Sequence, residues 1–175
     1  MAGAGIVKAE YNEREIQEII DAFSKASAPK LLELAEFAKG ELDYISNKAF
    51  EKEKDPVTGK NWEPLKNPRP KGKILYLGGQ LRRTLFGETF PDGSVIFGSN
   101  MEYARIHQEG GKTKPHDIEP HSAKALYFNG TFAKRVRHPG SDIPARPYLG
   151  IPKDFDRRLL NDPAVLDLLG LGCVT

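Results

Sequence analysis

The chain has a single cysteine, Cys173, no long apolar run and no excess of one charge. One cysteine cannot form an internal disulfide, as expected for a protein in a reducing compartment or one that needs no cross-links. No run approaches the roughly 18 apolar residues of a membrane span. The N-terminus also has no long apolar core typical of a signal peptide. The composition therefore predicts a protein of the cytoplasm that does not enter a membrane.

The charge is almost balanced, with 26 basic and 24 acidic residues among 175. Such a balance does not by itself indicate binding to nucleic acid. Residues 66–83 differ, because they contain six basic side chains and no acidic one: Lys66, Arg69, Lys71, Lys73, Arg82 and Arg83. This stretch predicts either a solvated loop and strand edge or a DNA-binding module. Its first part, residues 66–73, is rich in proline and predicts an extended, mobile loop.

The motifs of known enzyme classes are missing. The four histidines do not form an HxxxH or HExxH pair that would indicate a metal site: His107, His116, His121 and His138. There is no GxSxG motif, and neither Gly78-Gly79 nor Gly110-Gly111 fits a phosphate-binding loop. We therefore expect no enzymatic activity, no cofactor and no metal. A hydrolase built from the scattered histidines is the third possibility, after a structural protein and a DNA-binding module.

Apolar spacing predicts two helices in the first third of the chain. A short strand over 5–10 precedes a helix whose apolar stripe begins at Ile16 and ends at Phe23. The second helix is the longest element, about residues 28–53, with apolar residues spaced alternately four and three apart from Leu31 to Ala49. Pro29 suits its first turn. We interpret this stripe as core.

The remainder predicts short strands and short helices. Pro91-Asp92-Gly93 predicts a hairpin of residues 83–90 and 94–98, followed by a short helix that Asn100 caps and Gly110-Gly111 ends. A polar loop over 112–117 leads to strand-like pieces at Ile118, 125–128 and 131–138, the last two joined by Asn129-Gly130. Residues 143–149 must be extended because of their prolines. Pro152 opens a helix, and Asp162-Pro163 starts another that Gly170 ends.

Four motifs in order resemble the phage virion morphogenesis family, the tail-completion proteins of Mu-like and P2-like tailed phages. The motifs are Phe50…Asp55-Pro56…Gly59…Trp62…Pro64-Leu65; Gly79-Gln80-Leu81-Arg82…Thr84; Val95…Gly98-Ser99-Asn100…Tyr103-Ala104…Ile106-His107-Gln108…Gly110-Gly111; and Ile143 to Gly150. Residues 125–147 also look like the head-to-tail connector and neck proteins of long-tailed phages. The interruption at Asn161-Asp162-Pro163 departs from the single C-terminal helix expected for the family.

The resemblance implies a structural role in the virion. The chain would complete the phage or prophage tail and join it to the head, as a neck or tail-terminator ring, most plausibly a hexamer. Its partners would be other copies of itself, the tail tube, the head connector proteins and the passing DNA. It would be found in the host bacterial cytoplasm during assembly and then in the virion. Loops 66–73 and 111–124 would become ordered on assembly.

The fold expected is α+β, a small mostly antiparallel sheet packed against the long helix, with an N-terminal helix and a C-terminal helical segment. We divide the chain into an N-terminal strand and helix extension (1–27), the main domain (28–160) and a C-terminal tail (161–175). Tyr103, His107, Arg146 and Tyr148 are our candidates for the subunit or partner interface, because arginine and tyrosine are favoured interface anchors. The alternative is that Tyr103 and Tyr148 complete the core.

Overall fold

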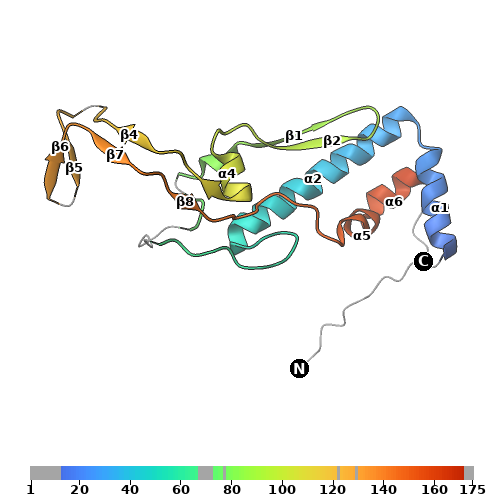
Figure 1. Ribbon diagram of the computed structural model, residues 1–175. Helices are drawn as coiled ribbons and strands as arrows, with labels where there is room; N and C mark the ends of the chain where they lie inside the picture. Colours follow the sequence, from blue (N-terminus) through green and yellow to red (C-terminus); the bar gives the residue numbers. More distant parts are fainter. Residues whose placement is uncertain (1–12, 67–72, 77, 122, 129, 172–175) are drawn as a thin grey trace, which may run out of the picture.

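The computed structural model describes residues 13–66, 73–76, 78–121, 123–128 and 130–171. The molecule is elongated, and the helix α2 (Ala28–Lys52) forms its spine (Figure 1). A β hairpin lies along this helix, three shorter helices gather near its N-terminal end, and a narrow β projection extends from the other end (Figure 1). The expected strand over 5–10, the basic residues Arg69 and Lys71, and Cys173 lie outside the described residues.

The boundaries of α2 agree with the sequence prediction. Pro29 occupies the first turn, where its missing N–H removes no helical hydrogen bond. The helix ends where Glu53 adopts a left-handed conformation, with φ 55°. Six α2 residues are buried, from one end of the helix to the other: Leu34, Ala35, Ile45, Ser46, Ala49 and Phe50. The helix therefore serves two separate apolar clusters, one at each end.

The predicted hairpin is present. Strands β1 (Leu85–Thr89) and β2 (Val95–Ser99) pair antiparallel, from Leu85 opposite Ser99 to Thr89 opposite Val95. The turn is closed by the N–H of Phe90, which donates to Ser94 O at 3.0 Å. Helix α3 (Gln80–Arg83) leads into this hairpin.

The helix predicted to begin at Asn100 begins later. Helix α4 (Ala104–Glu109) starts after a turn in which the Ala104 N–H donates to Met101 O at 2.9 Å. Ser99, rather than Asn100, supplies a side-chain acceptor here, because its hydroxyl accepts from the Met101 N–H at 3.3 Å. The predicted cap at Asn100 is therefore wrong. Gly110 ends the helix as expected.

The paired strands between Gly111 and Ile143 form a long, narrow projection, which we call the hairpin arm (Figure 1). Its base pairs β3 (Gly111–Lys112) with β8 (Asp142–Ile143), and its middle pairs β4 (His116–Ile118) with β7 (Val136–His138). Its tip pairs β5 (Leu126–Phe128) with β6 (Thr131–Ala133). The short strand predicted at Ile118 is present as β4, whereas β3 was not predicted, and the predicted strand over 131–138 is divided into β6 and β7.

Three short helices surround the N-terminal end of α2. They are α1 (Glu13–Ser24), α5 (Phe155–Leu160) and α6 (Pro163–Leu169). Asp162 caps α6, because its carboxylate accepts from the Ala164 N–H at 2.9 Å. Val165 and Leu169 of α6 pack with Leu34 of α2 in a buried cluster.

The α+β class expected from the sequence is confirmed, with all four described strand pairs antiparallel. They form four separate two-stranded pieces, however, rather than one small sheet. Among the described residues, no helix is long and apolar enough to cross a membrane.

Candidate functional site

Residues of all four sequence motifs meet at the end of α2 from which the hairpin arm extends. Tyr148 lies at the centre of this cluster and is only 1% exposed. Its ring centroid is 5.2 Å from that of Phe50, and Phe50 in turn contacts Trp62 edge-on at 5.7 Å. Leu81 and Ala104 complete the cluster from the second and third motifs. The motifs thus build the base that holds the arm.

Gln108 fixes the extended segment that follows the arm. Its Oε1 accepts from the backbone N–H groups of Tyr148 and Leu149, both at 3.0 Å, and its Nε2 donates to Leu149 O at 2.8 Å. Buried peptide groups need hydrogen-bond partners, and here the Gln108 side chain supplies the bonds that a neighbouring strand would otherwise form. One amide side chain on α4 therefore positions the extended segment that follows the arm.

Arg146 joins the same segment to the loop that carries Trp62. The Arg146 side chain is buried and donates to Glu63 O at 3.0 Å and to Pro64 O at 3.4 Å. Trp62 Nε1 donates in the opposite direction, to Pro147 O at 2.8 Å. Two chain segments more than 80 residues apart are thus joined by side-chain to backbone bonds on both sides.

The four predicted interface residues lie together, but they are not equally accessible. Tyr148 and Arg146 are buried within the chain, whereas Tyr103 and His107 are half-buried and contact each other edge-on at 5.8 Å. The burial of Tyr148 favours the alternative that it completes the core. The predicted role of these four residues at an interface stays a prediction.

Tyr103, His107 and Arg146 line a cavity of about 350 Å³ together with Leu65, Leu75, Tyr76, Gln80 and Leu81. Burial, and then the Arg146 charge, lower the pKa of His107, which favours the neutral imidazole. Its Nδ1 has no hydrogen-bond partner within the described residues. Burial, followed by the nearby Tyr103, raises the pKa of Tyr148 to about 12, so its hydroxyl stays protonated and can donate to Ala104 O at 3.3 Å.

Gly110 is the point where the arm meets this base, and we predict that Gly110→Ala destabilises the fold. Gly110 has φ 75° and ψ 179°, and a Cβ there would lie 2.7 Å from Ala145 N. Such a backbone conformation costs a residue with a side chain about 1–3 kcal/mol, before the clash is counted. The measurement is the free energy of unfolding in urea.

Gly98→Ala is the matched control, because a Cβ at Gly98 meets nothing within 4 Å. It should stay within about 1 kcal/mol of wild type. Equal stability of the two variants would contradict the tight contact described at Gly110.

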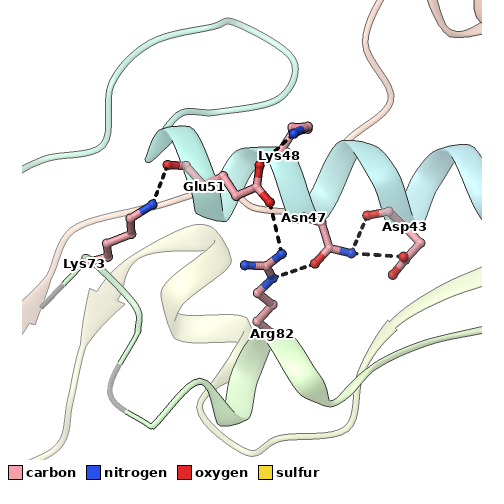
Figure 2. Close-up of polar contacts among 6 residues, drawn as sticks. All are labelled: Asp43, Asn47, Lys48, Glu51, Lys73 and Arg82. Atoms are coloured by element: carbon pink, nitrogen blue, oxygen red, sulfur yellow. Dashed lines mark hydrogen bonds and ion pairs between the residues drawn. The ribbon is translucent and has the colours of Figure 1, made fainter.

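Two of the described basic residues from the 66–83 stretch are bound to α2 (Figure 2). Arg82 donates to Asn47 Oδ1 at 2.6 Å and to Glu51 Oε1 at 3.3 Å, and Lys73 Nζ donates to Glu51 O at 3.1 Å. Lys48 and, more weakly, Arg82 hold the pKa of Glu51 below its usual value, so the carboxylate stays charged. Arg83 donates to Gly78 O at 2.7 Å. Lys73, Arg82 and Arg83 therefore form hydrogen bonds within the chain, and Lys66 is left exposed.

The hairpin arm is the main surface that sequence reasoning missed. Tyr127 and Phe132 face each other across its tip, 4.8 Å between ring centroids, yet they are 65% and 73% exposed. Farther down, Asp117 accepts from Arg135 and Arg137 on the opposite strand, which lowers the pKa of Asp117. Asn129-Gly130 indicated the turn. Nothing in the local pattern indicated that the tip would lie far from the core.

The histidines do not assemble into a site. His116 and His138 face each other across the middle of the arm, 5.0 Å between ring centroids. Within the ranges that the structure describes, no group of three or more His, Cys, Asp or Glu is placed to hold a metal ion.

Comparison with known proteins agrees with the four motifs. The model of the phage virion morphogenesis family matches residues 11–164. Protein G of Escherichia phage Mu, which is named as a capsid assembly protein, is 30% identical over 125 residues. That match covers 66% of this chain, and the chain spans 66% of the length of the Mu protein. No solved structure matches.

Proposed function

Since the chain belongs to the phage virion morphogenesis family, we propose that it completes the phage tail and joins it to the head as one subunit of a ring. Family membership makes it a structural or assembly protein of the virion. The finer assignment, to a sixfold neck or tail-terminator ring, is supported by the shape of the subunit. The same proposal places the subunit in the host cytoplasm before assembly and in the virion afterwards.

The hairpin arm is the observation that carries this proposal. It extends away from the base of the molecule (Figure 1). Its tip strands carry two exposed aromatic residues, Tyr127 and Phe132. An aromatic pair that the chain leaves in water gains most by entering a partner, because such residues dominate contact energies. A projecting arm is also compatible with a ring, because each subunit of a ring binds the next one through two different surfaces.

Other subunits of the ring would be the first partners, and the tail tube and the head connector proteins would lie on its two faces. DNA would pass through the opening. The alternative DNA-binding module loses support from the internal hydrogen bonds of Lys73, Arg82 and Arg83. A passing duplex needs no tight site, because specific affinity would hinder its movement.

The test is to remove the protein from the phage or prophage that encodes it and to examine the particles by electron microscopy. We expect separate DNA-filled heads and separate tails, which join when the wild-type chain is restored. The name of the Mu relative suggests the competing result, a failure to form heads at all. A lysate with tails but no filled heads would refute a role in tail completion.

A further inference from the structure

The two ends of the subunit expose complementary apolar surfaces. The hairpin arm extends from one end of α2 (Figure 1), and its tip strands β5 and β6 carry the exposed residues Tyr127 and Phe132. At the other end, the helices α1, α2, α5 and α6 enclose an apolar groove of about 680 Å³. Ile20 and Phe23 of α1 line this groove and are 53% and 42% exposed. Both surfaces keep large apolar side chains in water within a single chain.

The groove has a defined chemical character. Most of its lining is apolar and comes from all four helices: Ile19, Ile20, Phe23, Leu31, Leu34, Phe155, Leu159, Leu160 and Val165. Its charged lining residues are Asp92, in the β1–β2 turn, and Asp156 of α5. Hydrogen bonds from Ser94 lower the pKa of Asp92, so this carboxylate is charged at neutral pH. An occupant that fits would be apolar with positive charge beside it.

The arm tip has that character. Lys124 precedes β5 and Lys134 follows β6, both exposed, so two cations flank the aromatic pair. The tip strands themselves, Leu126–Phe128 and Thr131–Ala133, contain no charged residue. Each aromatic side chain could bury about 150–250 Å² on entering a groove.

We propose that the arm tip of one subunit inserts into the groove of a second copy of the chain, with Tyr127 and Phe132 against Ile20 and Phe23. This proposal deepens the ring assignment and rests on it. The arm cannot fill the groove of its own chain, because arm and groove lie at opposite ends of a helix of 25 residues, roughly 37 Å long. The contact joins two different surfaces, so an open assembly keeps one free arm at one end and one free groove at the other until the ring closes.

Cysteine cross-linking of the full-length chain tests this contact. We combine Phe132→Cys with Ile20→Cys after replacing the single native cysteine by Cys173→Ser. Under mild oxidation the double variant should form a ladder of disulfide-linked multimers that ends at a closed species. A disulfide needs Cα atoms about 4.4–6.8 Å apart, so the ladder reports direct contact.

Mixing the two single variants gives the matched control. Phe132→Cys and Ile20→Cys chains together should give mainly one heterodimer, since each carries half of the contact. Homodimers of one variant in place of the heterodimer would overturn the proposal. Absence of cross-links in the double variant, whether light scattering finds a ring or a monomer, would overturn it as well.

A second measurement does not depend on cysteines. The double substitution Tyr127→Ser with Phe132→Ser should shift the mass in light scattering from the ring towards 19.5 kDa, with an unchanged circular dichroism spectrum. Ile96→Ser, at an apolar residue 57% exposed on the other hairpin, should leave the ring intact. A ring that persists after the tip substitutions would refute the arm contact. It would not refute the role in tail completion, which electron microscopy of the particles tests separately.

Discussion

Replacing Tyr148 by alanine is expected to lower the free energy of unfolding by about 3–5 kcal/mol, the usual cost of removing a fully buried large aromatic side chain. Tyr148 is 1% exposed, packs on Phe50 and donates to Ala104 O. A domain of this size has a total stability of about 5–15 kcal/mol. The melting temperature should therefore fall by roughly 6–20 °C, measured by circular dichroism.

Tyr148→Phe separates the contribution of the aromatic side chain to stability from that of its hydroxyl group. It removes one hydrogen bond, to Ala104 O, and should cost about 0.5–1.5 kcal/mol. Tyr44→Ala, at an exposed tyrosine on α2, is the control for losing an aromatic side chain at the surface and should change stability little. If Tyr148→Ala unfolded with wild-type stability, the central place of Tyr148 in the core would be wrong.

The same variants address the predicted interface role of Tyr148. A core residue acts on assembly only through stability, so Tyr148→Phe should join heads to tails as wild type does. A Tyr148→Phe chain that is stable but fails to complete tails would instead support a direct contact with a partner. Burial makes the first result the expected one.

Removing the hairpin arm is expected to abolish tail completion while the rest of the subunit stays folded. Residues 114–140 would be replaced by Asn-Gly, which forms a tight turn between Thr113 and Ser141. These two residues are already paired, because the Thr113 N–H donates to Ser141 O at 2.9 Å. The cut leaves Gln108, Arg146 and Tyr148 and all their bonds in place.

Two measurements test this prediction, one of folding and one of tail completion. The truncated chain should still unfold cooperatively on heating, because neither buried apolar cluster contains a residue from 114–140. In the phage assay the truncated chain should leave separate filled heads and tails, with no detectable complementation. Full complementation by the truncated chain would show that the arm is dispensable, and the proposed function would lose its main support.

The double variant Tyr127→Ser with Phe132→Ser keeps the full length of the arm and removes only the aromatic side chains of its tip, so it is the matched control for the truncation. If shortening alone mattered, Tyr127→Ser with Phe132→Ser would complement normally. We expect instead that the full-length arm with serine at both positions fails nearly as completely as the truncated one. The arm would then act through its aromatic tip rather than through its reach alone.

The sequence by itself determined the local elements. The four-three apolar spacing from Leu31 to Ala49 and Pro29 at the start give α2, since helix periodicity and proline geometry act within a few residues. Pro91-Asp92-Gly93 gives the β1–β2 hairpin for the same kind of reason. The α+β class and the family followed from such local patterns and from the order of four motifs.

The tertiary structure decided where those elements lie and which side chains remain in water. Arginine and tyrosine suit an interface by residue type, yet Arg146 and Tyr148 are buried because Glu63 O, Pro64 O and Ala104 O, all distant in sequence, supply their acceptors. Tyr127 and Phe132 look like core residues by type, yet they remain exposed because the paired strands of the arm carry them away from α2. Burial depends on contacts between distant parts of the chain, and a local pattern does not contain them.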